Sequence, residues 1–158
     1  RLVNQKAIDR LIKIHSKLIK QGYSHRFFIV GDGPEKVKLQ SLIKEENVND
    51  TFMLMGKREN PYPYIKEADY FCLLSYYEGY GMALEEAKIL GKKIIITNTA
   101  ARECLEEYKR SIILDNSEEG IYNGLKKILD STNEETLEEN YIYSNDDKLR
   151  KIIELVGE

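Results

Sequence analysis

The sequence has few of the residues that mark membrane, disulfide-rich or metal-binding proteins. It contains 2 cysteines and 2 histidines among 158 residues, and no apolar run approaches the ~20 residues that a membrane-spanning helix needs. Cys72 lies in an apolar run and Cys104 in a predicted helix, without the close spacing of a zinc or redox motif. We therefore expect buried thiols rather than a disulfide or a metal site. His15 and His25 have no nucleophile near them in the sequence and are interpreted as structural, with His25 in a turn.

The chain also lacks a strong excess of charge. Its 24 basic and 27 acidic side chains give a net charge of −3, which argues against nucleic acid or an anionic membrane as the main partner. The first residues lack the basic-then-apolar pattern of a signal peptide, so a cytoplasmic location is expected. With 42% apolar and 32% charged residues, residues 1–158 have the composition of a single globular domain.

Apolar periodicity predicts helices that alternate with short buried strands, the pattern of a doubly wound, Rossmann-like α/β fold with helices on both faces of a parallel sheet. Strands are expected at 27–30, 51–55, 70–74, 93–97 and, as the last strand, 111–114. Helices are expected at 5–20, from 34, at 81–90, near 102–107 and from 117. The acidic stretch 133–140 is interpreted as a polar connector, and 144–147 as a capping box for a terminal helix with Leu149, Ile152, Ile153 and Val156.

In such sheets, ligands bind beyond the carboxyl ends of the strands, here at the loops 1–6, 31–34, 56–60, 76–82 and 98–102. The most informative loop contains Glu78 and Glu86, which bracket Gly79 and Gly81 between an apolar strand and a helix. Glycines let the backbone approach a ligand, and unpaired N–H groups at a helix start attract phosphate. Glu86, one turn into the helix, is placed to accept hydrogen bonds from sugar hydroxyls. The pattern predicts a ligand with phosphates and a sugar.

Each of these residues also has a structural explanation. An acid before a helix start, such as Glu78, gains about 0.5 kcal/mol from the helix dipole without a ligand. Lys6 could be an exposed lysine at a helix start, and Arg1 a loose terminal residue. A shift of one residue would exchange Glu86 with Glu85, which is interpreted as a solvated surface acid. A dinucleotide site is excluded because Lys36 stands where G-x-G-x-x-G requires its third glycine, and there is no Walker A loop.

Four short motifs follow one another along the chain, at 1–6, 30–35, 60–65 and 78–81, and seven residues separate Glu78 from Glu86. In this order and with this E-x7-E spacing, roughly residues 1–130 resemble the C-terminal, nucleotide-sugar-binding half of a retaining glycosyltransferase with the GT-B fold, of the family-four (group 1) type. One departure is Ala7, where the family usually has glycine. No Asp-x-Asp motif of metal-dependent glycosyltransferases is present.

The resemblance implies a role for each site residue. Arg1 and Lys6 would stabilise the donor diphosphate as it leaves, Glu78 would bind the donor sugar hydroxyls and Glu86 the nucleotide ribose. Amides of the glycine loop would approach the sugar and phosphates, and the base would be bound mainly by backbone of the loop that carries Arg58. The remaining substrate-binding residues are Gly79, Tyr80, Gly81 and Met82. No cofactor and no metal are implied.

The resemblance further implies transfer of a sugar from a nucleoside diphosphate to a glycan, lipid or other acceptor with retention of configuration. The acceptor site would lie in an N-terminal domain that this chain lacks, so we expect the isolated chain to bind nucleotide without turnover. Peripheral membrane association is considered for the full enzyme only. The alternative is a non-catalytic nucleotide-binding or interaction module on the same fold, and a sugar-nucleotide epimerase is a weaker third hypothesis.

The family's motif also places a strand directly before the residue matched by Arg1, in the middle of the sheet. An empty central position would leave two rows of backbone N–H and C=O groups unpaired. We expect upstream residues or another copy of the chain to fill it, or the neighbouring strands to close up. Residues 1–4 are not expected to form this strand.

Overall fold

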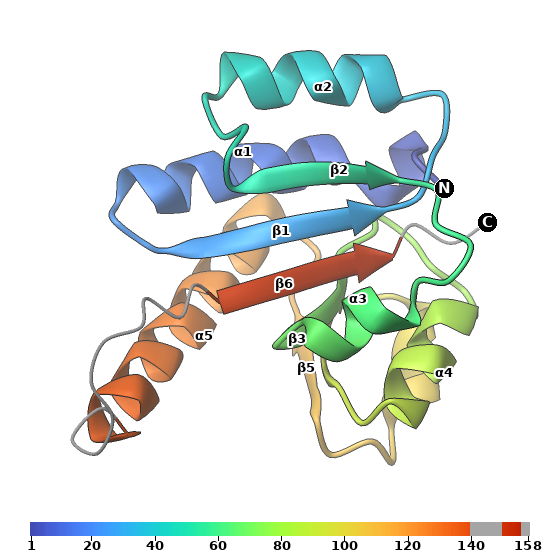
Figure 1. Ribbon diagram of the computed structural model, residues 1–158. Coiled ribbons are helices and arrows are strands. Elements are labelled where there is room, and N and C mark those ends of the chain that lie inside the picture. The colour runs from blue at the N-terminus through green and yellow to red at the C-terminus, as the bar shows by residue number, and fades with distance from the viewer. Residues whose placement is uncertain (140–149, 156–158) are drawn as a thin grey trace.

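The computed structural model describes the backbone of residues 1–139 and 150–155 and the side chains of residues 1–131. Six strands form one sheet in the order β2-β1-β6-β3-β4-β5, and every neighbouring pair is parallel (Figure 1). The strands are β1 (His25–Val30), β2 (Phe52–Gly56), β3 (Tyr70–Leu73), β4 (Lys93–Thr97), β5 (Ser111–Leu114) and β6 (Arg150–Leu155). The predicted doubly wound parallel sheet is confirmed.

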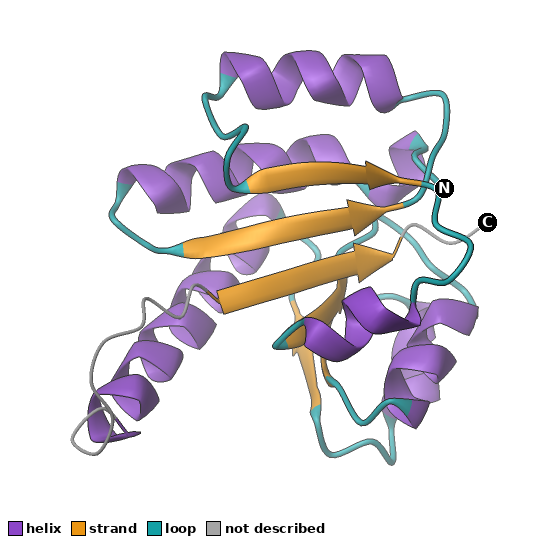
Figure 2. Ribbon diagram, viewed as in Figure 1, coloured by secondary structure: helices purple, strands orange, loops and turns teal. Residues whose placement is uncertain are grey.

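Helices cover both faces of this sheet (Figure 2). They are α1 (Ile8–Lys20), α2 (Lys36–Glu45), α3 (Tyr62–Glu67), α4 (Met82–Ile89) and α5 (Glu118–Glu139), with 3-10 segments η1 (Asn4–Lys6) and η2 (Ala100–Leu105). One buried cluster lies between the sheet and α1, α2 and α5, and includes Leu11, Phe27 and Cys72. A second lies under α3, α4 and η2 and includes Phe71 and Leu84. Adjacent β3 residues Phe71 and Cys72 thus face opposite cores, as the strand's alternation requires.

The C-terminal part of the chain differs from the sequence-based expectation. Residues 150–155 form the strand β6 rather than a helix, so 111–114 is not the last strand. The helix α5 continues to Glu139, so 133–139 is helical rather than a connector. The proposed capping box, Leu149 and Val156 lie outside the described residues. A run with adjacent β-branched residues at 152 and 153 suits a strand as well as a helix, and pairing with two open strand edges decides between them.

β6 occupies the central position of the sheet, between β1 and β3. It pairs with β1 on one side and β3 on the other, so that Ile152 lies opposite both Phe27 and Tyr70. Residues 1–3 form no strand, as expected. The occupant is the chain's own C-terminal segment, which was not among the three expected solutions. It satisfies the backbone groups on the facing edges of β1 and β3.

The two histidines form a buried pair at the opposite end of the sheet from the predicted site. His15 lies on α1, and His25 is the first residue of β1 rather than part of a turn; both are fully buried. His15 Nδ1 lies 2.9 Å from His25 Nε2, and His15 Nε2 lies 2.8 Å from Thr51 Oγ1. Burial lowers the pKa of His15 from 6.5 to about 3, with a further contribution from His25, and burial lowers the pKa of His25 to about 4.

These lowered pKa values predict a loss of stability in mild acid. Below pH 6.5 the unfolded chain binds protons at both histidines, whereas the folded chain does not until the pH nears 3 to 4. The free energy of unfolding should therefore fall between pH 7 and pH 5, by up to about 2 kcal/mol per histidine. Urea unfolding at several pH values measures it. In the double variant His15→Gln, His25→Gln, most of this pH dependence should vanish; an unchanged slope would show that other groups cause it.

The central placement of β6 predicts that its backbone donors are essential. The Cα of Ile153 lies opposite those of Phe28 in β1 and Phe71 in β3. Ile153→Pro removes a ladder N–H and should lower the free energy of unfolding by at least about 2 kcal/mol. Ile153→Val keeps the donor and should cost under about 1.5 kcal/mol. Urea unfolding compares the two variants, and a proline variant as stable as the valine variant would place this segment outside the sheet.

Candidate functional site

The five predicted site loops lie at one edge of the sheet and are joined to one another by backbone hydrogen bonds. Figure 1 shows the N-terminus at the arrowheads of β1 and β2. Four bonds link the loops in series: Gly31 N to Gly56 O (2.9 Å), Leu2 N to Asp32 O (2.9 Å), Tyr76 N to Gln5 O (2.9 Å) and Ala101 N to Glu78 O (3.0 Å). The loops that follow four parallel strands, together with the N-terminal segment, therefore form one connected edge.

Lys6 and Glu78 meet at this edge as an ion pair. Lys6 Nζ lies 2.6 Å from Glu78 Oε2, and each side chain is 13% exposed. Ser75 Oγ also donates to Glu78 Oε2, at 3.4 Å. Lys6 ends η1 and Glu78 lies between β3 and α4, so residues 72 positions apart are brought together. Lys6 is therefore not an exposed lysine at a helix start, and the pair presents a largely buried cation beside a carboxylate.

The glycine loop leads directly into α4 and leaves its first turn without a side-chain cap. Gly81 is the N-cap residue, and a Cβ added there would lie 3.1 Å from Leu84. A Cβ added at Gly79 would meet nothing within 4 Å, so the backbone there is open to a ligand. Tyr80 and Met82 are exposed. Unpaired N–H groups of such a helix start are suited to an anion.

The neighbouring acids of α4 have different partners. Glu86 Oε1 accepts a hydrogen bond from Tyr62 Oη of α3 at 3.3 Å, whereas Glu85 pairs with Lys88 at 3.0 Å. Glu86 is thus joined to the segment that follows β2, and Glu85 to its own helix. Tyr62 was not among the predicted site residues. It lies in the 60–65 motif, and this motif was the feature of the sequence that could have identified it.

The two predicted arginines are placed differently. Arg1 is exposed, but Leu2 is buried and its carbonyl accepts a hydrogen bond from Glu35 N at 3.2 Å. A Cβ added at Gly33 would lie 2.5 Å from Leu2 O, so only glycine permits this approach. The backbone next to Arg1 is therefore fixed at the edge. Arg58 is exposed, with its guanidinium carbon 5.5 Å from the centre of the Tyr64 ring.

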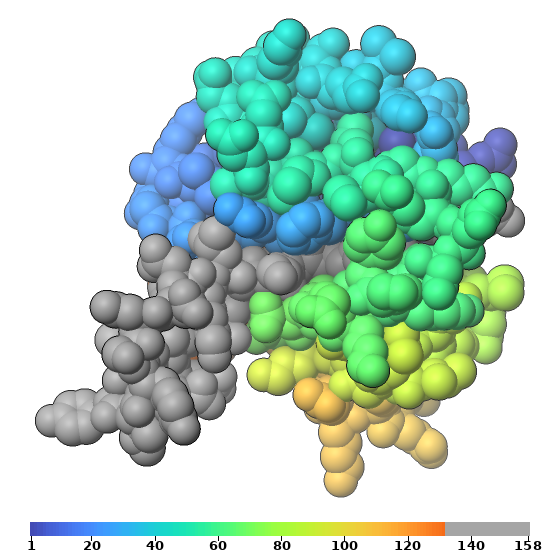
Figure 3. All heavy atoms as spheres, viewed as in Figure 1, coloured from blue at the N-terminus to red at the C-terminus, as the bar shows by residue number. Residues whose placement is uncertain are grey.

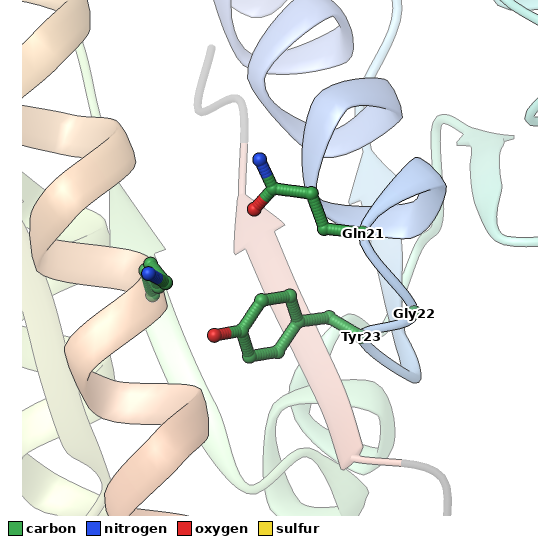
Figure 4. A pocket seen from close by; sticks show the side chains of 4 residues that line it. Gln21, Gly22 and Tyr23 are labelled. Atoms are coloured by element: carbon green, nitrogen blue, oxygen red, sulfur yellow. The ribbon is translucent and has the colours of Figure 1, made fainter.

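A surface depression of about 300 Å³ lies elsewhere, lined by Gln21, Gly22, Tyr23 and Lys126 (Figure 4). It is near the amino end of β1, opposite the predicted site. Tyr23 Oη donates to Asp130 Oδ1 at 2.6 Å, and this hydrogen bond raises the pKa of Tyr23 to about 12. The depression contains none of the motif residues.

Among the described residues, no group of three or more His, Cys, Asp or Glu side chains could hold a metal ion. No helix in the same part of the chain is long and apolar enough to cross a membrane. Cys72 is buried and Cys104 partly buried, and neither forms a disulfide.

In the space-filling view, the segments from β2 to α4 lie next to one another on the same face of the molecule (Figure 3).

The geometry agrees with a comparison against protein families, in which residues 1–146 match the model of glycosyl transferases group 1. The chain belongs to this family. It is 31% identical over 130 residues to a Campylobacter jejuni enzyme, N-acetylgalactosamine-N,N'-diacetylbacillosaminyl-diphospho-undecaprenol 4-alpha-N-acetylgalactosaminyltransferase. The aligned residues make up 80% of this chain and 31% of the relative. It is 26% identical over 139 residues to the Staphylococcus aureus poly(ribitol-phosphate) alpha-N-acetylglucosaminyltransferase, with 87% and 28% covered. The chain thus spans about a third or less of the length of these relatives.

Solved structures of glycosyltransferases share the fold. The crystal structure of TarM superposes with a TM-score of 0.74 at 22% identity, covering 83% of this chain and 27% of TarM. Anabaena HepE in complex with UDP superposes with a TM-score of 0.70 at 19% identity, covering 86% of this chain and 38% of HepE. The predicted GT-B, Rossmann-like class is therefore confirmed for this glycosyltransferase domain.

Ala7, between η1 and α1, is the position at which this chain departs from the motif of the family. It is buried and has φ 53° and ψ 33°, in the left-handed region that favours glycine. An L-residue with a Cβ is strained there. The usual glycine at this position thus has a backbone reason, and this chain tolerates alanine at a cost.

Replacing this alanine should therefore stabilise the protein. Ala7→Gly relieves the strain and should raise the free energy of unfolding by about 1 kcal/mol. The matched control is Ala87→Gly, at a buried position inside α4, which should lower it by about 1 kcal/mol or more because glycine is a poor helix former. Urea unfolding measures both. Destabilisation by both changes would mean that Ala7 is not strained.

Proposed function

We propose that this chain supplies the donor site of a retaining glycosyltransferase that transfers a sugar from a nucleoside diphosphate to an acceptor. The single observation that carries the proposal is the Lys6–Glu78 pair, 2.6 Å apart, beside the uncapped start of α4. A cation and helix amides suit a diphosphate, and the neighbouring carboxylate suits sugar hydroxyls. A donor that contains both groups uses every part of this arrangement.

In this proposal the main chemical task is to stabilise the leaving diphosphate. Lys6, Arg1 and the start of α4 would oppose the negative charge that develops as the bond to the sugar breaks. When the donor binds, the Glu78 carboxylate would leave Lys6 and accept hydrogen bonds from sugar hydroxyls. The departing phosphate would accept the acceptor proton on the same face, which gives retention and requires no protein base from this chain.

Glu86 and Tyr62 are proposed to bind the ribose of the donor. Their hydrogen bond of 3.3 Å joins α4 to α3, and a carboxylate held in this way can accept bonds from vicinal hydroxyls. Gly79, Gly81 and the backbone of Tyr80 and Met82 would approach the sugar and phosphates. Arg58 would lie in the loop that binds the base.

The relatives suggest which donors to test first. The Campylobacter jejuni relative is named as an N-acetylgalactosaminyltransferase, and the Staphylococcus aureus relative as an N-acetylglucosaminyltransferase. The HepE structure contains UDP. We therefore propose a UDP-linked N-acetylhexosamine as the donor.

The acceptor site is proposed to lie in a further domain of the same enzyme, because the chain spans 26% to 31% of its first three curated relatives. Residues 1–158 alone should then bind the nucleotide without sustained transfer. A cytoplasmic location and peripheral membrane association of the full enzyme remain predictions. A non-catalytic nucleotide-binding module is the competing hypothesis, and transfer by the full enzyme would reject it.

Binding of UDP and of UDP-N-acetylhexosamines tests the donor site. Glu86→Ala should weaken UDP binding by about 1 to 3 kcal/mol, the scale of hydrogen bonds to a charged group, and should barely change the free energy of unfolding. Titration calorimetry measures the affinity, and thermal shift compares uridine, guanosine and adenosine diphosphates.

The matched control is Glu85→Ala, which removes an adjacent carboxylate that pairs with Lys88. This change should leave the UDP affinity within about twofold, well under the 1.4 kcal/mol of a tenfold effect. Equal affinities of the Glu86 variant and the wild type would assign the ribose to another residue. Absence of any nucleotide binding by the wild type would reject the donor-site proposal.

A further inference from the structure

The segment from Leu74 to Glu78 is held by other elements along its whole length. It runs from the end of β3 to the acid of the Lys6–Glu78 pair. Each of its five carbonyl oxygens accepts a hydrogen bond from outside the segment. The donors, in order, are Arg10 Nη2 (2.9 Å), Thr97 Oγ1 (2.7 Å), Asn116 Nδ2 (2.6 Å), Gln5 Nε2 (3.0 Å) and Ala101 N (3.0 Å).

Four of these five donors are side chains, and they come from η1, α1, β4 and the loop after β5. Carbonyls of an ordinary surface loop are hydrated and the loop is mobile. Here protein donors replace water at each carbonyl, and the N–H of Tyr76 is bonded to Gln5 O as well. The backbone before Glu78 is therefore fixed from both sides of the sheet.

Arg10 is the charged member of this set and the most buried arginine among the side chains of residues 1–131. It is 8% exposed, and its Nη2 also donates to Asn116 Oδ1 at 3.0 Å. Its guanidinium carbon lies 4.3 Å from the centre of the Tyr76 ring. A buried arginine is costly unless its donors are satisfied, and here Nη2 alone donates to two protein oxygens. Arg10 and Asn116 together bind the carbonyls of Leu74 and Tyr76.

We propose that Arg10 and Asn116 are positioning residues for Glu78, and that they set the part of donor affinity that comes from the sugar. Neither needs to touch the donor. By fixing the backbone from Leu74 to Tyr76 they aim the Glu78 carboxylate at the sugar, whereas the diphosphate would be bound by Lys6 and the start of α4, which lie outside the segment from Leu74 to Glu78. The inference rests on the proposed function of Glu78 and adds the residues that pre-organise it.

The test compares Arg10→Met and Asn116→Ala with Lys13→Met, a control on the exposed face of the same helix α1. Titration calorimetry with UDP-N-acetylglucosamine and with UDP separates the sugar contribution from the nucleotide contribution. Arg10→Met should weaken binding of the sugar nucleotide about tenfold and that of UDP less than about threefold. Asn116→Ala, at a partly exposed position, should show the same pattern with less effect on folding. Lys13→Met should change neither affinity.

Amide hydrogen exchange of the ligand-free chain gives a second readout that does not depend on donor identity. Exchange at Tyr76 to Gly79 should accelerate about tenfold in Arg10→Met and in Asn116→Ala beyond any change in global stability. Arg10→Lys keeps the charge but loses the planar guanidinium and its contact with the Tyr76 ring, so it should restore little of the protection.

Two results would overturn the positioning role. One is unchanged exchange at these amides in both variants. The other is an equal loss of affinity for UDP and for the sugar nucleotide, which would indicate a general loss of structure. If the wild type binds no nucleotide, the proposed function fails, and the exchange rates still decide whether Arg10 and Asn116 order the segment.

Discussion

The structure depends on the pairing of β6 between β1 and β3. Without a strand there, the facing edges of two buried strands would leave their N–H and C=O groups unpaired, and no side chain could satisfy so many of them at once. With β6 in place, β1 and β3 are held in a common register, since Ile152 lies opposite both Phe27 and Tyr70. The distance between the loops that follow β1 and β3 is set by this single strand.

The geometry of the site depends on the sheet, because backbone hydrogen bonds hold the site loops at the ends of the strands. The N-terminal segment is attached to the turn after β1 by Leu2 and to the loop after β3 by Gln5. It therefore spans the carboxyl edge of β6 and brings Lys6 to Glu78. Gly33 makes one of these attachments possible, because any Cβ there would collide with the backbone of Leu2. The predicted site is thus an assembly of loops whose backbone groups hydrogen-bond to one another.

Local pattern was enough to predict most elements. The strands at 93–97 and 111–114 have the predicted bounds, because runs of isoleucine flanked by polar residues allow little else. The glycines between Glu78 and Glu86 located the loop before α4. Contacts between distant residues were beyond prediction from local pattern. Examples are Tyr62 with Glu86, Arg10 with the carbonyl of Leu74, and β6 in the middle of the sheet.

His25 illustrates the same limit. Because it is polar and precedes an apolar run, the sequence predicts a turn, whereas the structure buries it through its hydrogen bond with His15.

The Lys6–Glu78 pair has a consequence for the ionic conditions under which the protein works. A lysine that is already paired with a carboxylate 2.6 Å away presents little net charge to dissolved ions. An anionic ligand that takes the place of Glu78 then exchanges one bound anion for another. Such an exchange releases few ions to the bulk, so the affinity for the ligand should depend less on salt concentration than the affinity of a site made of exposed cations.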